Sequence, residues 1–206
     1  MTTVVSAEFT RAIAGREVVA RCHPALERHA HWLLGVFDEL DREGKDVWGG
    51  QRIEVGWSLL TLWREGERWI VHEPNFAGDP FRGTRGDVTT SLSVQAQQND
   101  VVKRVGVEPV KVSFQDHILI GEGCLDAPDV YLQRHEPPTP SHSGWYLGPV
   151  NGDVEERENF YVYELLKRRQ AVLQVLALPP GYLAVFERDR IKAVLNSADE
   201  DLWTRH

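Results

Sequence analysis

The sequence has few cysteines, no long hydrophobic run and no export signal at its start. Its two cysteines, Cys22 and Cys124, lie far apart in the chain and share no CxxC or zinc-ligand spacing, so neither a disulfide framework nor a structural zinc site is predicted. No window approaches the roughly 18 apolar residues that a transmembrane helix needs. The N-terminal segment lacks a basic start followed by an apolar stretch. We therefore expect a cytoplasmic protein with two free thiols.

Basic residues are also in short supply. The 206 residues include 23 Lys and Arg against 31 Asp and Glu, which gives a formal net charge of -8. Such a chain repels phosphate groups over most of its surface, so nucleic acids and anionic membranes are disfavoured as partners and a basic protein is favoured. Hydrophobic residues make up 42% and charged residues 26%, values that are ordinary for a soluble globular protein and exclude wholesale disorder.

Catalytic and cofactor-binding motifs are absent. The chain contains no GxxxxGK[ST], GxGxxG or GxSxG pattern. The pair His72 and Glu73 lacks the second histidine that an HExxH zinc motif requires. We therefore predict no metal, no cofactor and no catalytic residues. The alternative is a hydrolase whose site is built from scattered residues such as His72, Glu73, His117 and Cys124.

The hydrophobic periodicity predicts an α+β fold, in which antiparallel sheets or hairpins pack with helices in two small subdomains. Apolar residues at steps of three and four predict a helix from Pro24 to about Glu43 that ends at Gly44. Alternation of apolar and polar residues predicts a hairpin with strands near 52–63 and 68–73. Further expected elements are a short helix over 7–21, a helix over 91–105, strands over 110–114, 118–121 and 182–186, and a helical run over 161–176.

A change in composition suggests where the chain divides. Four prolines lie between residues 128 and 140, which is typical of a linker or a proline-rich loop. We place the boundary just before them. This gives an N-terminal α+β region of unassigned family over residues 1–126 and a second α+β domain over residues 127–206.

Carboxylates cluster at the predicted end of the first long helix, in the segment DELDREGKD. The helix macrodipole disfavours negative charge at a C-terminus, and a basic partner docked there would offset that cost. A solvated helix end without a partner is the other interpretation. The candidate partner-binding residues are Asp38, Glu39, Asp41, Glu43, Asp46 and Trp48.

The C-terminal part of the chain resembles a known family. Its run VYLQRHEPPTPSHSGWYLGPVNG contains an Arg-x-x-Pro strand end and a Ser-Gly-Trp step, and LALPPGYLAVFERD contains a Leu-x-x-Pro-x-Gly turn before a closing strand. This order, over residues 129–190, is similar to immunity protein family thirty-three of bacterial polymorphic-toxin systems. The family has an acidic residue before the Ser-Gly-Trp step, where this chain has His142. The matching positions are Arg134, Pro137, Ser143, Gly144, Trp145, Leu165, Leu176, Leu178, Pro179, Gly181, Phe186 and Arg188.

The resemblance implies a non-catalytic immunity protein that binds a cognate toxin and occludes its active site. The acidic net charge fits a toxin with a basic surface, because opposite charges steer the two proteins together. An adaptor or regulatory module that binds another protein is the second hypothesis, and the scattered-site hydrolase is the third. An adjacent toxin-like gene would separate the first hypothesis from the second. The sequence does not indicate an oligomeric state.

Overall fold

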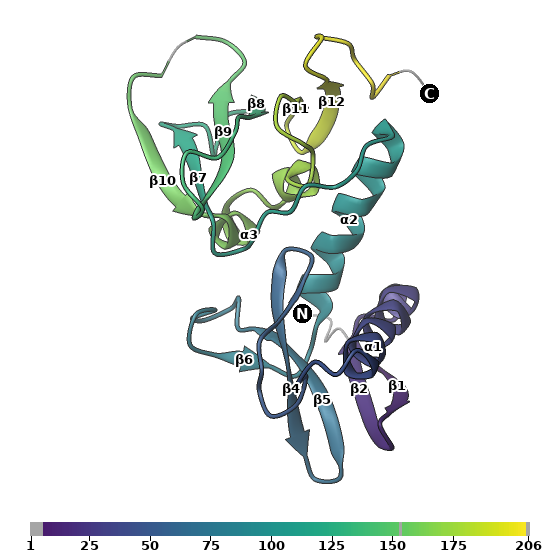
Figure 1. The fold of residues 1–206 in the computed structure, drawn as a ribbon. Coiled ribbons are helices and arrows are strands. Elements are labelled where there is room, and N and C mark those ends of the chain that lie inside the picture. Colours follow the sequence, from purple (N-terminus) through teal and green to yellow (C-terminus); the bar gives the residue numbers. More distant parts are fainter. Residues whose placement is uncertain (1–5, 153, 205–206) are drawn as a thin grey trace. The chain divides into compact units, whose positions relative to one another are not determined.

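The computed structural model describes residues 6–152 and 154–204, and the chain forms two compact units, Met1–Ala96 and Gln97–His206 (Figure 1). The division falls inside α2 (Thr89–Val105). The boundary predicted between residues 126 and 127 lies within the second unit, between two strands that belong to one sheet.

The first unit is built on a mixed sheet with the strand order β1-β2-β5-β4-β3, and β6 pairs with β5. Strands β2 and β5 run parallel, and the other described pairs are antiparallel. The strands are β1 (Ala7–Ile13), β2 (Arg16–Cys22), β3 (Ile53–Val55), β4 (Ser58–Glu65), β5 (Arg68–Pro74) and β6 (Thr84–Arg85). The hairpin predicted near 52–63 and 68–73 is thus confirmed, with an additional turn between β3 and β4.

The helix predicted over residues 7–21 is wrong, because these residues form the antiparallel hairpin β1–β2. Ala14 and Gly15 occupy its turn with φ angles of 48° and 73°. Two consecutive residues with positive φ match the twist of a tight hairpin. The alternate residues Val18, Ala20 and Cys22 then all belong to the core of this unit, which is the period of a strand rather than a helix.

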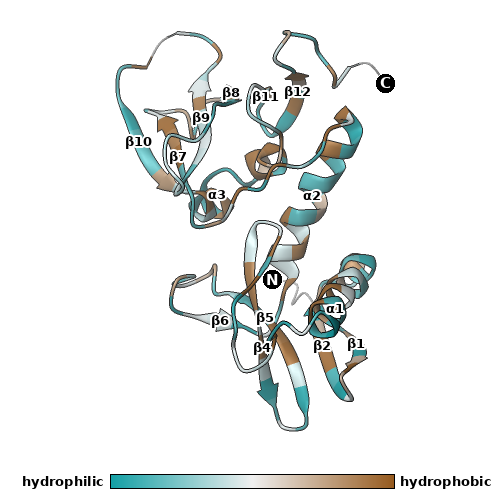
Figure 2. Ribbon diagram, viewed as in Figure 1, coloured by the Kyte–Doolittle hydropathy of each residue, from teal (hydrophilic) through white to brown (hydrophobic). Residues whose placement is uncertain are grey.

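Helix α1 (Glu27–Arg42) follows a 3-10 turn, η1 (Pro24–Leu26), and packs against β1 and β2. The helix predicted from Pro24 to about Glu43 is confirmed. Its end is closed as expected: Gly44 has a φ of 77°, and the Lys45 N–H donates to the Leu40 carbonyl at 3.0 Å. Hydrophobic residues occupy the middle of β2, β4 and β5, whereas the strand ends are hydrophilic (Figure 2). The apolar stripe of α1 is fully buried at Ala30, Leu33, Leu34 and Phe37.

The second unit contains a six-stranded sheet in the order β10-β7-β9-β8-β11-β12. Strands β7 and β9 are parallel, and the other described pairs are antiparallel. The strands are β7 (His117–Gly121), β8 (Asp129–Arg134), β9 (His142–Pro149), β10 (Arg157–Tyr161), β11 (Leu183–Glu187) and β12 (Arg190–Leu195). The predicted strands over 118–121 and 182–186 are confirmed. The one expected over 110–114 is wrong, because those residues form no strand.

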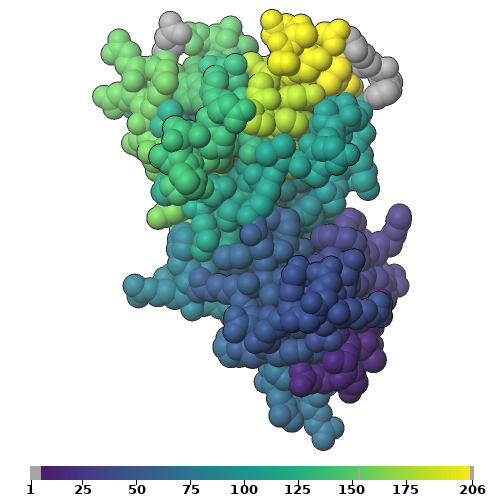
Figure 3. Space-filling model, in the orientation of Figure 1, coloured from purple at the N-terminus to yellow at the C-terminus, as the bar shows by residue number. Residues whose placement is uncertain are grey.

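The helical run predicted over 161–176 is broken into three pieces. These are η2 (Val162–Glu164), α3 (Leu165–Arg168) and η3 (Gln170–Val175). The break occurs at Arg169, where φ is -157° and ψ is 70°. Residues 201 and 202 then lie beside β12, since the Leu202 N–H donates to the Val194 carbonyl at 2.8 Å (yellow in Figure 3). Fully buried core residues of this unit include Ile118, Val130, Leu132, Trp145, Leu147, Leu165, Leu173 and Phe186.

Both units therefore confirm the predicted α+β class. Each sheet contains one parallel pair, so the sheets are mixed rather than purely antiparallel. Within the described residues, no helix has both the length and the apolar character that crossing a bilayer requires.

Candidate functional site

The acidic end of α1 holds one carboxylate that serves the fold. Asp38 is 6% exposed, and its Oδ2 accepts hydrogen bonds from Arg11 Nη2 at 2.6 Å and from Arg42 Nη2 at 2.8 Å. Arg11 lies on β1, so this ion pair fastens the helix to the sheet. The charge of Asp38 is thus compensated by two guanidinium groups within the unit.

Two further candidate carboxylates organise the loop after α1. Asp41 Oδ1 accepts a hydrogen bond from Trp48 Nε1 at 3.0 Å, and Asp46 Oδ1 accepts one from the Trp48 backbone N–H at 3.1 Å. The Trp48 ring packs edge-on against Trp69 with 5.0 Å between centroids, and the Arg16 guanidinium lies 4.2 Å from its centroid. Trp48 is therefore half-buried and fixed on several sides.

The remaining two candidates point outward. Glu39 and Glu43 are both exposed, and Glu43 forms an ion pair with Lys45 at 2.9 Å. Trp32 is 46% exposed on the same helix. Steps of four, three and four residues join Trp32, Val36, Glu39 and Glu43, so these residues lie along one side of α1. We call this side, defined by Trp32, Glu39 and Glu43, the α1 outer face.

Trp32 was missing from the predicted site, although the sequence contains the signal for it. The apolar stripe of the helix passes through Leu33 and Leu34, and Trp32 precedes both and falls outside the stripe. An aromatic residue off the core stripe of an amphipathic helix is exposed, and exposed tryptophans are enriched at the centres of protein interfaces.

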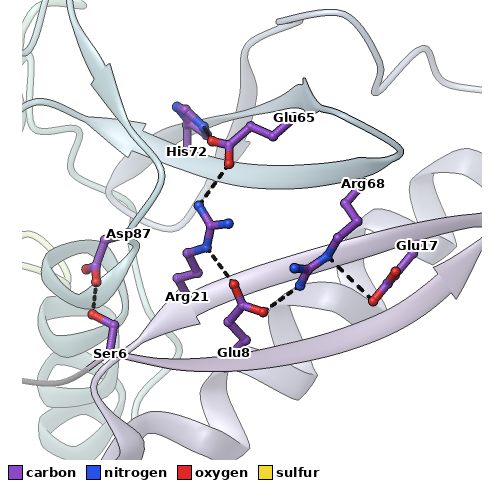
Figure 4. Close-up of polar contacts among 8 residues, drawn as sticks. All are labelled: Ser6, Glu8, Glu17, Arg21, Glu65, Arg68, His72 and Asp87. Carbon is purple, nitrogen blue, oxygen red and sulfur yellow. Dashed lines mark hydrogen bonds and ion pairs between the residues drawn. The ribbon is translucent and has the colours of Figure 1, made fainter.

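The opposite face of the first sheet carries a network of ion pairs (Figure 4). Glu8 accepts hydrogen bonds from Arg21 Nε at 2.9 Å and from Arg68 Nη2 at 2.6 Å, and Arg21 Nη1 donates to Glu65 at 3.0 Å. These hydrogen bonds lower the pKa of Glu8 and Glu65. Val19 lies on this face by strand alternation and is fully buried. The network therefore neutralises its own charges while its long side chains help to cover apolar residues.

Two more contacts extend this network. His72 Nε2 lies 3.4 Å from Glu65 Oε1, and Arg68 Nε lies 3.6 Å from Glu17 Oε1. The Ser6 hydroxyl donates to Asp87 (Figure 4). Burial lowers the pKa of His72, the nearby Glu65 notwithstanding.

The four residues of the alternative hydrolase site each have a different environment. His72 and Glu73 are adjacent on β5, so their side chains point to opposite faces of the sheet. Glu73 is fully buried and accepts a hydrogen bond from the Ser91 N–H at 2.7 Å, in the first turn of α2, and burial raises its pKa to about 7. His117 lies 4.4 Å from Tyr161 between ring centroids. Cys124 is 1% exposed, and burial raises the pKa of its thiol.

These four residues do not come together within either unit, since His72 and Glu73 belong to the first and the other two to the second. Among the described residues, no group of three or more histidine, cysteine, aspartate or glutamate side chains has the spacing to hold a metal ion.

In the second unit, the residues of the family motif meet around Arg134. This arginine is 2% exposed, and its Nη1 donates to the carbonyls of Leu176 and Leu178, which precede Pro179. Its guanidinium also reaches the Val110 carbonyl at 2.9 Å. Burial lowers the pKa of Arg134 to about 10. Trp145 Nε1 donates to the same Leu176 carbonyl at 3.0 Å, so the motif arginine and tryptophan hold one turn together.

Two motif glycines have positive φ angles, and at Gly144 a backbone carbonyl also comes close. Gly144 has a φ of 79°, and a Cβ there would lie 2.2 Å from the His135 carbonyl oxygen. Gly181 has a φ of 88°, and its N–H donates to the Arg134 carbonyl at 2.8 Å. His142, which stands where the family has an acid, accepts the Gly144 N–H on its Nδ1 at 2.9 Å. A carboxylate would accept the same hydrogen bond, so the imidazole supplies the acceptor that the turn needs.

Comparison with known families finds one similarity, and it lies in the second unit. Residues 97–197 match the family model described as the Imm33-like domain. The match confirms the resemblance over residues 129–190 and extends it from the C-terminal half of α2 to the residues after β12. The C-terminal part of the chain is thus similar to the Imm33-like domain, which its description places among immunity proteins. No curated protein and no solved structure matches the chain.

Proposed function

We propose that the protein is an immunity protein that binds a cognate bacterial toxin, occludes the toxin's active site and so protects the cell during competition between bacteria. It acts in the cytoplasm by binding, without catalysis. The match of residues 97–197 to the Imm33-like domain carries this proposal. The net charge of -8 supports a toxin with a basic surface, because it would steer such a partner into contact.

We further propose that the α1 outer face is the contact surface for the toxin. Glu39 and Glu43 would attract basic side chains, and Trp32 would provide a large apolar anchor at the centre of the contact. The other predicted residues would act indirectly: Asp38, Asp41, Asp46 and Trp48 fasten the helix end that presents the two glutamates.

A growth assay tests this proposal. Bacteria that express the product of an adjacent toxin-like gene should survive only when this protein is co-expressed, and the two purified proteins should co-elute from a sizing column. The double variant Glu39→Lys/Glu43→Lys should lose protection. Glu67→Lys, an exposed change in the turn between β4 and β5, should retain it as the matched control.

Three outcomes would count against parts of the proposal. A harmless neighbour, or a lack of rescue by the folded wild-type protein, would contradict toxin neutralisation. Full protection by the double variant would contradict the α1 outer face as the contact surface while leaving the immunity function intact.

A further inference from the structure

The Imm33-like domain contains a groove of about 1030 Å³ in which basic side chains outnumber acidic ones. The groove lies among α3 and the start of η3, residues 125–128, and the turn between β11 and β12. Four basic residues line it, Lys167, Arg168, Arg169 and Arg188, against the two carboxylates of Asp126 and Asp189. A local excess of positive charge is unexpected in a chain whose net charge is -8. We call this site the arginine groove.

Arg169 lines the arginine groove and connects three segments around it by hydrogen bonds. It is 6% exposed, and its guanidinium donates to the carbonyls of Cys124 at 2.8 Å, Ala127 at 2.6 Å and Arg188 at 2.9 Å. Among the described residues, no carboxylate lies within 4.0 Å of it. Its Nη1 and Nη2 groups donate to backbone carbonyls, which carry no net charge, so its positive charge is retained beside the groove. The same hydrogen bonds fix the segment after β7 and the β11–β12 turn relative to α3.

The turn at Arg188 adds a second observation. Arg188 has a φ of 57°, a left-handed conformation that glycine or asparagine adopts more readily. Its N–H donates to the Pro128 carbonyl, and its own carbonyl accepts the hydrogen bond from Arg169. A long charged residue held in a strained conformation at the rim of a groove points to a role for its side chain. Arg168 also lines the groove, and its guanidinium lies 5.1 Å from the centroid of the Phe160 ring.

We propose that the arginine groove binds a small phosphate-bearing molecule. Guanidinium groups pair with phosphate oxygens through two parallel hydrogen bonds, and several of them around one cavity suit a ligand with more than one negative charge. The volume is that of a small-molecule site. The overall negative charge of the protein repels a long polyanion such as a nucleic acid, so the groove selects a short anion. The groove belongs to the second unit, whereas the proposed toxin contact lies on α1 of the first.

Calorimetric titration of the full-length protein with pyrophosphate and with ADP tests the proposal. At low ionic strength both should bind with a dissociation constant below a millimolar, and binding should weaken at least tenfold in Arg168→Gln and in Arg188→Gly. The glycine variant suits the left-handed turn, so it removes the side chain without opposing the fold. Arg190→Gln alters an exposed arginine outside the groove and should bind like the wild type.

Several results would overturn the proposal. The first is that the wild type binds neither pyrophosphate nor ADP. The second is that Arg190→Gln weakens binding as much as the groove variants do, which would indicate diffuse attraction. The third is that succinate binds with equal affinity, which would show no preference for phosphate. Thermal melting should give the same midpoint for Arg188→Gly as for the wild type or a higher one. Protection from the toxin should be unchanged in Arg188→Gly, which separates a failure of this proposal from a failure of the proposed function.

Discussion

The two units differ in the partners of their arginine side chains. In the first unit, Arg21 and Arg68 lie on the sheet surface and are paired with carboxylates. In the second unit, Arg134 and Arg169 are buried and are surrounded by backbone carbonyls instead. Carbonyl dipoles accept hydrogen bonds from the terminal Nη groups, but unlike carboxylates they carry no net negative charge. The arginines on the sheet face of the first unit are therefore neutralised by carboxylates. The buried arginines of the second unit keep a positive charge that can attract an anion.

The two kinds of arginine should also contribute differently to folding stability. Exposed ion pairs each contribute roughly 0–1 kcal/mol, so the network in Figure 4 is of modest importance to folding. A buried arginine that holds several carbonyls is costly to remove, because each carbonyl then loses its partner away from water. We therefore expect that removing a buried arginine lowers the free energy of unfolding much more than removing an exposed one.

The largest expected effect follows the removal of Arg134. Arg134→Met keeps a long side chain but leaves the carbonyls of Leu178 and Val110 without this donor, while the Leu176 carbonyl keeps only Trp145 Nε1. We expect a loss of about 3–5 kcal/mol in the free energy of unfolding of the second unit, measured by urea denaturation. Arg21→Gln should cost less than about 1 kcal/mol in the first unit. Equal costs for the two variants would contradict the comparison.

A second prediction compares glycines of similar backbone conformation. Gly144→Ala places a Cβ 2.2 Å from a carbonyl oxygen, whereas Gly66→Ala, at a φ of 65°, meets no atom within 4 Å. The control should cost about 1–2 kcal/mol through its backbone conformation alone. The motif variant should cost at least about 3 kcal/mol, since a backbone clash in a core must be relieved by moving a strand. Thermal denaturation of both variants measures the gap, and similar melting points would show that β9 adapts.

A third prediction concerns Glu73, a buried carboxylate whose pKa lies near neutrality. In the folded chain the pKa of Glu73 is about 7, against 4.5 for the free group. Because burial favours the neutral form, this group lowers the stability of the first unit progressively as the pH rises from 4.5 to 7. The full effect above pH 7 amounts to about 3 kcal/mol.

Glu73→Gln should remove this pH dependence, because a glutamine side chain does not ionise. The fold should be kept, since the amide oxygen can still accept the Ser91 N–H. Urea denaturation at pH 5 and pH 8 should show a smaller difference in the variant than in the wild type. Asp87→Asn is a useful comparison: hydrogen bonds from Ser6 and Thr89 lower the pKa of Asp87 in spite of its burial, so its contribution has the opposite sign. An unchanged pH profile in Glu73→Gln would contradict the assignment.

Local periodicity predicted the elements whose side chains obey it. The stripe from Leu26 to Leu40 identified α1, and the alternation from Ile53 to Thr61 identified the β3–β4 region. It failed at residues 7–21, where alanines favour a helix but the Ala14-Gly15 turn and the strand pairing decide the outcome. It failed again at Arg169, because the guanidinium reaches carbonyls distant in the sequence and interrupts the helix there.

Local periodicity also predicted part of the candidate site. The exposure of Glu39 and Glu43 follows from their place on an amphipathic helix. The burial of Asp38 does not, since it depends on Arg11 from a strand that the sequence did not reveal. The arginine groove is formed by contacts between segments that are distant in the sequence, so the local pattern around Lys167 does not predict it.

The measurement that tests the central claim most directly is a calorimetric titration of the folded protein with the purified product of an adjacent toxin-like gene. The account predicts one-to-one binding in the sub-micromolar range, weakened at least tenfold by Trp32→Ala, which removes the exposed anchor of the α1 outer face. The absence of binding at micromolar concentrations, with both proteins folded, would contradict the claim that this chain neutralises a toxin by binding it.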